Sequence, residues 1–239
     1  FYINFPFGVG MTHNGNLTNW VDLKSNRFPA SNICMESSCD VEAILYAFAD
    51  GLGKADPTLP MSERVAAGVK SVFHLAKGAY SVGGILSEGA LFAFRDPVGI
   101  KPCIIGKRVT EEGTEWAAAS ESVALDMMGF ERVRDFKNGE VLFVRPGEEP
   151  VFLQVANVKH RACIFELVYF ARPDSFLDEI SVYKTRRRFG EALADQWRDV
   201  GAPPPDVVIP IPDSARDAAL SAANHLGLPY REGFIKNRY

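Results

Sequence analysis

Four short stretches decide the fold of this chain: HNGNLTN at residues 13–19, FRDPVGIKP at 94–102, VYFARPDS at 168–175 and KNRY at 236–239. The first one follows residues 5–13, whose loose alternation of apolar and polar residues predicts a strand. Because Asn-Gly is a strong turn signal, Asn14 and Gly15 are expected in a loop at the end of that strand. An oxyanion hole is the second interpretation, since an Asn amide and the next glycine N–H can both point at one carbonyl oxygen. Glycine would permit close approach and an unusual φ there.

Two helices and then many short strands are predicted over the first two thirds of the chain. Apolar residues at helical spacing predict helices over 39–50 and 62–76, with Ser37 or Ser38 capping the first and Ser62 capping the second. Beyond them, residues 79–155 predict short strands separated by turns. The predicted strands are YSVGGIL, ALFAF, CIIG, EWAAAS, EVLFV and VFLQV, with one short helix near 121–129.

The character of the sequence changes after about residue 160. The continuous apolar run CIFELVYF, residues 163–170, predicts a buried strand. The predicted elements that follow are a charged amphipathic helix over 182–200, the parallel-sheet strand DVVIPI at 206–211, a helix over about 214–226 and a strand near 229–235. This order indicates the opening of a doubly wound α/β domain.

Composition excludes several classes of protein. The chain has 239 residues, of which 47% are hydrophobic and 23% charged, as in ordinary globular proteins. A net charge of −4 gives no basic surface for nucleic acid, and no apolar run reaches the roughly 18 residues of a membrane helix. Four cysteines without a CxxC pair favour a reduced, cytoplasmic protein with free thiols. We therefore expect no nucleic-acid partner and no membrane partner.

Together the four stretches closely resemble the amidophosphoribosyltransferase family, glutamine-dependent enzymes that open purine synthesis. The resemblance implies a mixed α/β (α+β) fold in two parts. Residues 1–160 would form an N-terminally truncated glutamine amidotransferase domain, an Ntn-hydrolase αββα four-layer sandwich. Residues 161–239 would begin a type I phosphoribosyltransferase domain, which is doubly wound.

The resemblance also implies an activity and its partners. The whole enzyme would hydrolyse glutamine and pass the ammonia to the second domain, where it displaces pyrophosphate from phosphoribosyl pyrophosphate to give 5-phosphoribosylamine. Glutamine and phosphoribosyl pyrophosphate would be its substrates, and the enzyme would be a homo-oligomer, a dimer or a tetramer.

The glutamine site is implied at two places in the sequence. Asn14 and Gly15 would bind the oxyanion, and Asp40 would bind the substrate's α-ammonium group, which suits a charge-assisted hydrogen bond. The family usually has Ser-Asp-Ser-Glu where this chain has CDVE at 39–42, so Asp40 and Glu42 match and their neighbours do not. The alternative is that these carboxylates only face the positive end of a helix dipole.

Five further positions match functional positions of the family. Phe165, Tyr169 and Tyr239 correspond to walls of an ammonia channel, where apolar surfaces exclude water. Ser214 corresponds to a residue that contributes to magnesium and phosphoribosyl pyrophosphate binding. Cys163 corresponds to an iron–sulfur ligand in some members, although a [4Fe–4S] cluster needs four cysteines and a buried small hydrophobe is the alternative.

Other motifs have structural interpretations. Arg95 and Asp96 are expected as a buried pair beside a tight turn. Residues 120–122 are expected to cap a short helix, and ARPDS at 171–175 to form a junction loop. The three arginines at 186–188 favour a solvated helix face over a phosphate-binding patch.

The beginning of the chain bears on activity. Enzymes of this class attack glutamine with an N-terminal cysteine, whose free α-amino group acts as base, whereas the first residue here is Phe1. We therefore expect an internal fragment without glutaminase activity of its own. Two alternatives are another class II amidotransferase such as asparagine synthetase, which FARPDS and PYREGFIKNRY disfavour, and a non-catalytic class II amidotransferase-like protein.

Overall fold

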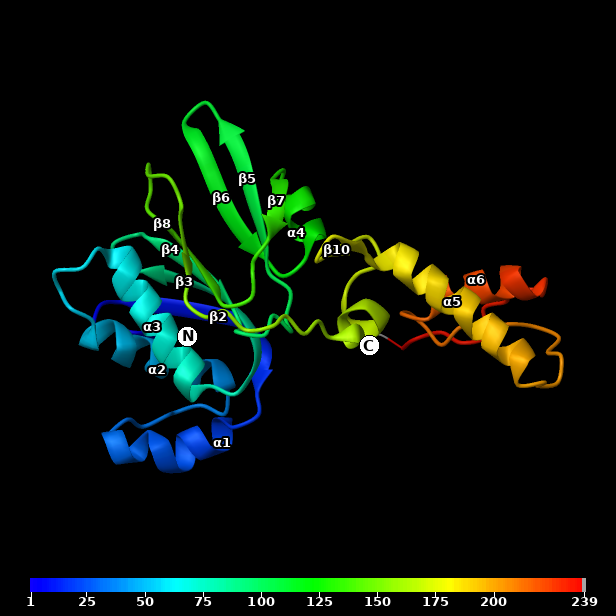
Figure 1. Ribbon diagram of the computed structural model, residues 1–239, viewed down its shortest axis with the longest axis horizontal. Coiled ribbons are helices and arrows are strands. Elements are labelled where there is room, and N and C mark those ends of the chain that lie inside the picture. Colours follow the sequence, from blue (N-terminus) through cyan, green and yellow to red (C-terminus); the bar gives the residue numbers. More distant parts are fainter. Residues whose placement is uncertain (238–239) are drawn as a thin grey trace. The chain divides into compact units, whose positions relative to one another are not determined.

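The structure is a computed structural model that describes residues 1–237 and divides into two compact units (Figure 1). Unit 1 comprises residues 1–120 and 124–162, and unit 2 comprises residues 121–123 together with the chain from Cys163 onward. The elements up to residue 162 are β1 (Tyr2–Ile3), β2 (Val9–Leu17), α1 (Trp20–Asp22), a π-helix (Leu23–Arg27), a 3₁₀ turn (Pro29–Ser31), α2 (Asp40–Lys54), α3 (Met61–Leu75), β3 (Gly78–Leu86), β4 (Leu91–Arg95), β5 (Ile104–Thr110), β6 (Gly113–Ala119), α4 (Ser122–Met127), β7 (Glu131–Asp135), β8 (Glu140–Val144) and β9 (Val151–Gln154).

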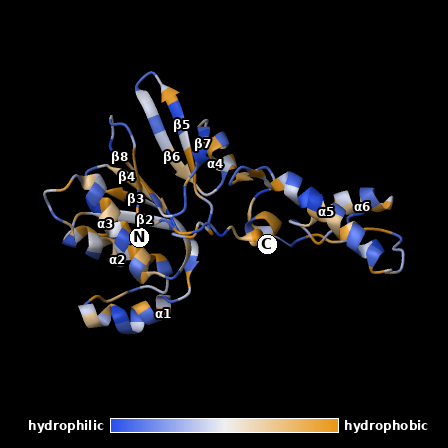
Figure 2. Ribbon diagram, in the orientation of Figure 1, coloured by the Kyte–Doolittle hydropathy of each residue, from blue (hydrophilic) through white to orange (hydrophobic). Residues whose placement is uncertain are grey.

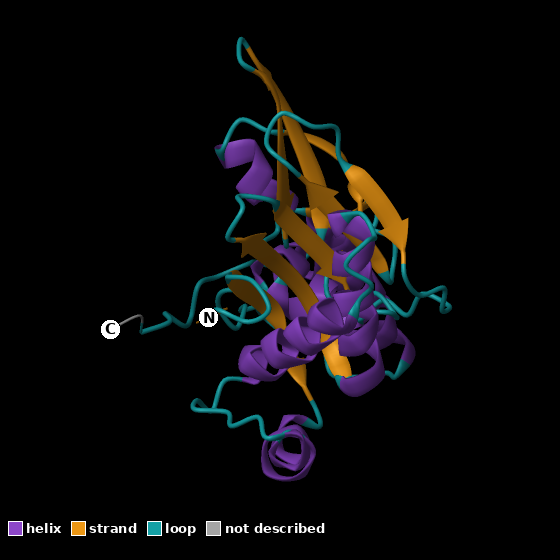
Figure 3. Cartoon of the chain, turned by 90° about the vertical axis from the view of Figure 1, so that its left-hand side faces the viewer, coloured by secondary structure: helices purple, strands orange, loops and turns teal. Residues whose placement is uncertain are grey.

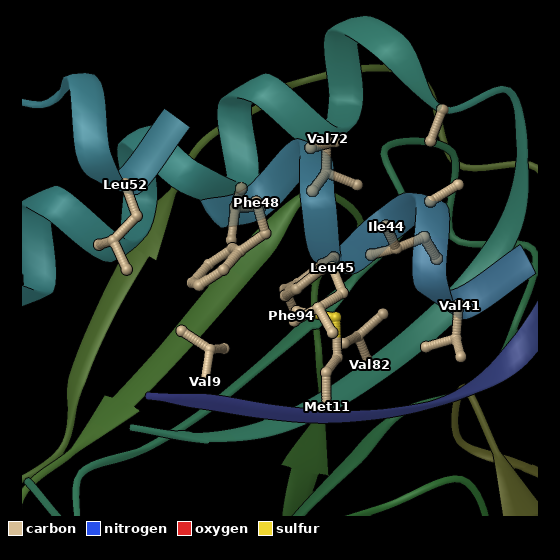
Figure 4. Packing of buried hydrophobic residues seen from close by; sticks show 14 of the residues in the cluster. Val9, Met11, Val41, Ile44, Leu45, Phe48, Leu52, Val72, Val82 and Phe94 are labelled. Atoms are coloured by element: carbon tan, nitrogen blue, oxygen red, sulfur yellow. The ribbon is translucent and has the colours of Figure 1, made fainter. Parts of the chain in front are cut away.

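Two antiparallel sheets form the centre of unit 1. The larger has six strands in the order β1-β2-β3-β4-β8-β9, and the smaller has three in the order β6-β5-β7. Helices α2 and α3 lie side by side on one face of the six-stranded sheet, and Figure 4 shows side chains of α2 packed on those of β2 and β4. The ring of Phe48 on α2 stacks on Phe92 of β4, with ring centroids 4.6 Å apart.

The three-stranded sheet covers the other face of the larger sheet. Ala93 and Leu142 point away from the helices and form a second core with Cys103, Ile105 and Phe136. On the far side of β5, the side chain of Leu125 from α4 packs against Gly106. The order helix, sheet, sheet, helix confirms the expected αββα arrangement, with α4 as its outer helix.

Helix α2 forms where the apolar spacing predicts it. Its buried positions include Val41, Ile44, Leu45, Phe48 and Leu52, three or four residues apart. Such spacing puts them on one helix face. The second predicted helix likewise corresponds to α3, where Val65, Val69 and Val72 are buried.

The predicted helix caps are wrong. The residue before α2 is Cys39 and the residue before α3 is Pro60, and neither side chain makes a capping hydrogen bond. Instead, Glu42 reaches back from the first turn of α2 and accepts hydrogen bonds from the backbone N–H groups of Glu36 and Ser37, both 2.8 Å long. The Glu42 carboxylate thus binds the backbone of the segment that precedes α2.

Unit 2 contains a π-helix (Glu166–Phe170), a short hairpin of β10 (Phe176–Leu177) and β11 (Ile180–Ser181), α5 (Val182–Asp199) and α6 (Arg216–Leu226). Hydrophilic and hydrophobic residues are mixed along α5 in Figure 2, as an amphipathic helix requires. A Cβ on Gly190 of α5 would lie 2.1 Å from the Ala218 carbonyl of α6. The two helices therefore cross in close contact at this glycine.

Three strand predictions in unit 2 need correction. DVVIPI and the segment near 229–235 contribute one isolated parallel bridge, between Val208 and Tyr230, instead of two full strands. The run at 163–170, predicted as a buried strand, is helical, and its aromatic side chains are exposed. The error has a physical reason, because the periodicity of a short apolar run does not distinguish a strand from a helix.

Figure 3, which separates helices from strands by colour, shows how the strands of the fold lie together in sheets.

Two expectations about polar residues of unit 2 are also corrected. Arg186 is 3% exposed rather than solvated, whereas Arg187 and Arg188 are exposed as predicted. Glu121 and Ser122, expected to cap α4, bind the loop that carries ARPDS. The backbone N–H of Arg172 donates to Glu121 Oε2 at 2.8 Å, and the N–H of Phe176 donates to Ser122 Oγ at 2.9 Å.

Candidate functional site

The HNGNL segment lies within strand β2, so the predicted turn is wrong. Asn14 faces Ser81 and Gly15 faces Tyr80 across the antiparallel pairing of β2 with β3. The pairing continues without interruption from Val9 to Leu17. A long-range ladder of hydrogen bonds therefore overrides the local turn preference of Asn-Gly.

Glycine is required at position 15 by close approach. A Cβ there would lie 2.3 Å from the carbonyl oxygen of Ala79 and 2.6 Å from Cα of Tyr80. Gly15 is not one of the glycines with positive φ in residues 1–237, so the expected unusual φ is not found. The small residue thus allows β2 and β3 to approach.

The backbone N–H of Gly15 points away from β3. The carbonyl of Tyr80 accepts a 2.8 Å hydrogen bond from the N–H of Asp96, so the peptide groups of Tyr80 point toward β4. Two residues that face each other in an antiparallel ladder either exchange both backbone hydrogen bonds or exchange none. Because the carbonyl of Tyr80 points to β4, Tyr80 and Gly15 exchange none, and the N–H of Gly15 points to the outer side of β2. The N-terminal residues 1–3 pair with Val9, Gly10 and Met11 of β2, before Gly15 is reached, so this N–H can donate to a ligand at that side.

A cleft of about 350 Å³ lies over β2 and β3 on the side of the smaller sheet. Asn14, Ser81, Gly83, Cys103 and Ser120 are among its lining residues. Alternate residues of a strand point to opposite faces, and Val9, Met11 and Leu17 point to the helices. Asn14 therefore points to the opposite face, toward this cleft.

Ser81 is a cleft residue that the sequence interpretation missed. It is 5% exposed, and its Oγ has no hydrogen-bond partner within residues 1–237. A buried hydroxyl without a partner is costly, which is typical of a position that a bound molecule completes. The sequence contains the residue but not the pairing register that puts it opposite Asn14.

Asp40 lies in the first turn of α2 and contacts β2 directly. Its Oδ2 accepts a 2.7 Å hydrogen bond from the backbone N–H of Leu17. Its Oδ1 lies 3.1 Å from Nε2 of His13, at ion-pair distance but outside hydrogen-bond alignment. The fold thus brings Asp40 to the strand that carries Asn14 and Gly15.

The Glu42 carboxylate fixes the segment before α2 electrostatically. Burial raises its pKa, but hydrogen bonds from the Ser37 hydroxyl and the backbone N–H groups of Glu36 and Ser37 outweigh this, so that the net pKa is lowered. The ionised form is therefore favoured, and it holds Ser37 at the start of the helix that carries Asp40.

Cys103 is the cysteine nearest to the cleft, and it is a poor nucleophile. Burial raises the pKa of its thiol to about 12, and the residue is 4% exposed. The attacking species in thiol chemistry is the thiolate. Cys34 and Cys39 are also free thiols, and Cys34 is exposed.

Arg95 and Asp96 are both buried, as predicted, and both bind the backbone of one turn. The Arg95 guanidinium donates to the carbonyls of Lys101 (2.7 Å), Gly99 (2.9 Å) and Phe136 (2.9 Å). The Asp96 carboxylate accepts the N–H groups of Gly99 and Lys101. The motif shapes the turn after β4.

The remaining predicted site residues lie in unit 2. Phe165 and Tyr169 are each 60% exposed. Cys163 is half-buried at the start of the unit, and Ser214 is half-buried in the turn before α6. Tyr239 lies outside the described residues. Within residues 1–237, no three His, Cys, Asp or Glu side chains gather as a metal site.

Comparison with known proteins gives one family. The chain is 44% identical over 241 residues to the amidophosphoribosyltransferase of Pseudomonas aeruginosa, 41% over 245 residues to that of Escherichia coli and 43% over 245 residues to that of Saccharomyces cerevisiae. Each alignment covers 100% of this chain and 48% of the relative. The chain thus spans about half the length of the curated relatives it matches. No family model matches the chain.

Solved structures agree with these relatives. The glutamine phosphoribosylpyrophosphate amidotransferase of Bacillus subtilis, complexed with ADP and GMP, superposes with a TM-score of 0.80 at 29% identity and covers 100% of this chain and 48% of its own. A structure described as the allosteric regulatory enzyme of purine biosynthesis has a TM-score of 0.79 at 30% identity, covering 97% of this chain and 46% of its own. The described helices include none that is long and apolar enough to cross a membrane.

Proposed function

Because the chain belongs to the amidophosphoribosyltransferase family, we propose that a full-length enzyme carrying it forms 5-phosphoribosylamine, pyrophosphate and glutamate from glutamine, water and phosphoribosyl pyrophosphate. The observation that carries the proposal is the arrangement on β2. There the Asn14 side chain faces a cleft, and the next residue, Gly15, directs its N–H to the outer side of the strand. The identity to curated relatives along the whole chain supports it.

In this proposal, Asn14 and Gly15 stabilise the negative oxygen that forms during glutamine hydrolysis. A thiolate attacks the carboxamide carbon, and the carbonyl oxygen gains charge in the tetrahedral intermediate. Donors already oriented toward that oxygen stabilise it without reorganisation. We assign the attacking thiol to an N-terminal cysteine of the full-length enzyme, since burial keeps the Cys103 thiol protonated.

Asp40 is proposed to bind the α-ammonium group of glutamine. Its carboxylate is 13% exposed, so a ligand can reach it, and a charge-assisted contact there would be only weakly screened. The hydrogen bond from Leu17 leaves lone pairs free on the carboxylate, because each oxygen can accept more than one hydrogen bond.

Ammonia is proposed to pass along Phe165, Tyr169 and Tyr239 to phosphoribosyl pyrophosphate. Apolar and aromatic walls exclude water, which keeps ammonia unprotonated and nucleophilic. Ammonia then attacks the ribose carbon that bears pyrophosphate, the pyrophosphate leaves with the bonding electrons, and the nitrogen loses a proton.

Two inorganic groups are expected at unit 2 of a full-length enzyme, magnesium and a [4Fe–4S] cluster. Magnesium binds oxygen ligands and phosphates, and we propose that the Ser214 hydroxyl supplies one such oxygen; when bound, the ion would neutralise pyrophosphate charge. A [4Fe–4S] cluster needs four thiolates. We propose that Cys163 supplies one of these thiolates in a full-length enzyme, in which the other three come from residues beyond Tyr239.

We also propose a cytoplasmic homo-oligomer, a dimer or a tetramer. The free state of all four cysteines supports a reducing compartment. Gel filtration with light scattering measures the oligomeric state, and a monomeric full-length enzyme would refute this part.

The experiment that tests the function is a paired product assay. The full-length enzyme is incubated with glutamine and phosphoribosyl pyrophosphate, and glutamate and pyrophosphate are quantified together. The proposal predicts equal amounts of both products. A protein that forms neither product, although it is folded, would instead be a non-catalytic relative.

A further inference from the structure

A buried arginine binds the end of the π-helix in unit 2. Arg186, on α5, is 3% exposed. Its Nε donates to the carbonyl of Leu167 at 2.9 Å, and its Nη2 donates to the carbonyl of Ala171 at 2.7 Å. One planar guanidinium therefore holds two backbone carbonyls that are four residues apart.

These two carbonyls lie in and just after the last turn of the π-helix. The N–H of Ala171 donates to the carbonyl of Glu166, which closes the wide turn of this helix. The last carbonyls of a helix have no partner within it, and π-helical turns are rare and occur frequently at functional sites. Arg186 supplies the missing donors and fixes this turn to α5.

The other side of the same segment presents large apolar side chains. Phe165, Tyr169 and Phe170 are 58% to 60% exposed. The rings of Tyr169 and Phe170 meet edge to face, with centroids 5.4 Å apart. Since two consecutive rings are ordered by each other and by the helix, their directions depend on the backbone that Arg186 holds.

Burying an arginine at this position costs free energy, because its charge loses contact with water. Its presence therefore indicates a specific role. Burial lowers the pKa of Arg186, as expected for a desolvated cation. A buried charge is tolerated only where hydrogen bonds compensate it. Val182 and Gly190, one turn away on either side, are buried as well and are apolar or small. An apolar residue would fill the same face without binding the carbonyls.

We propose that Arg186 is a positioning residue that sets the direction of Tyr169 through the Leu167 and Ala171 carbonyls that it binds. By fixing this ring, it keeps the ammonia passage closed to water in the full-length enzyme, so that each glutamine hydrolysed yields one phosphoribosylamine. This inference rests on the proposed function and assigns it a residue that does not touch a substrate. Lysine cannot replace it, because an ammonium has no planar fork.

The test is the coupling ratio of the Arg186→Lys variant in the full-length enzyme. Glutamate and pyrophosphate are measured in the presence of glutamine and phosphoribosyl pyrophosphate. We expect loss of coupling, seen as glutamate in excess of pyrophosphate, while the rate with saturating ammonia is retained. Arg187→Lys, a change at an exposed neighbour on the same helix, should leave the ratio at one.

The outcomes separate this inference from the proposed function. An Arg186→Lys variant that remains coupled, with or without a lower melting temperature, would show a purely structural residue and overturn the inference alone. If that variant does not fold, Arg186→Gln, which keeps one donor group, is measured in the same way. A wild-type enzyme that forms no product would overturn the proposed function itself.

Discussion

The carboxylate of Asp40 accepts a 2.7 Å hydrogen bond from the backbone N–H of Leu17. This contact joins the first turn of α2 to the last residue of β2, the strand that carries Asn14 and Gly15. The strand and the helix, which α1, the π-helix and the 3₁₀ turn separate in the sequence, are thereby fixed relative to each other. The same carboxylate is the proposed partner of the substrate's ammonium group, so its two tasks have to be separated by experiment.

The variant Asp40→Asn separates them. The amide oxygen can still accept the Leu17 hydrogen bond, whereas the charge that would attract an ammonium group is lost. Charged hydrogen bonds contribute about 1.5–3 kcal/mol, which corresponds to roughly one to two decades in kcat/KM for glutamine. We expect most of this as a raised KM in the full-length enzyme, with little change in melting temperature.

The control for Asp40→Asn is Asp50→Asn on the same helix. Asp50 is more exposed and pairs with Lys54 at 2.7 Å, so its loss should leave the KM for glutamine unchanged. A destabilised Asp40→Asn enzyme with normal KM would refute the binding role and leave Asp40 as a structural link.

Gly15→Ala should be strongly destabilising because the new methyl group meets backbone atoms. Overpacking of this kind typically costs about 1–3 kcal/mol, and here the 2.3 Å contact involves the Ala79 carbonyl, which cannot rotate away. Gly83→Ala is the matched control on the paired strand, since no atom lies within 4 Å of its added Cβ. Urea unfolding of both variants measures the difference. Equal stabilities would contradict the close approach of β2 and β3.

Glu42→Gln should remove a pH-dependent part of the stability. The folded-state pKa of Glu42 is lowered, so its contribution is fully present above the unfolded pKa of about 4.3 and is lost as the pH falls through the lower folded value. The wild type should thus exceed the variant in unfolding free energy at pH 7, and the gap should shrink below about pH 4.3. Urea midpoints across that pH range measure it.

Glu63→Gln gives the comparison for this effect. Glu63 lies in the first turn of the neighbouring helix α3 and is exposed. The difference in unfolding free energy between wild type and variant could have the same size and pH dependence for Glu63→Gln as for Glu42→Gln. That result would mean that the hydrogen bonds from residues 36 and 37 to Glu42 do not cause it.

Much of unit 1 could be predicted from the sequence because its elements repeat in simple patterns. Apolar residues in α2 recur every three or four positions, and the strand runs near β3, β4 and β8 are bounded by turn residues. The short strand β7 was not predicted, since ERVRD is mostly charged. It forms because its backbone pairs with β5, a long-range contact that local composition does not show.

The errors have physical causes of the same kind. HNGNL forms a strand because β3 pairs with it throughout, and Ser81 joins the site through that register. The three arginines 186–188 look equivalent in sequence. Only the first shares a helix face with Val182 and Gly190, so it alone is buried. The aromatic run at 163–170 has the composition of a core strand. It forms a helix instead, and Arg186 of α5 donates hydrogen bonds to the backbone at its end.

The most direct test of the account compares two nitrogen sources in the Asn14→Ala variant of the full-length enzyme. Asn16→Ala is the control, because Asn16 points to the same face of β2 and is exposed. With glutamine, Asn14→Ala should lose roughly 10²–10³ in rate through loss of one oxyanion donor. With free ammonia it should retain nearly the full rate, since ammonia bypasses the glutamine site, and the control should be active with both sources. An equal loss with both nitrogen sources, or no loss with glutamine, would contradict the account.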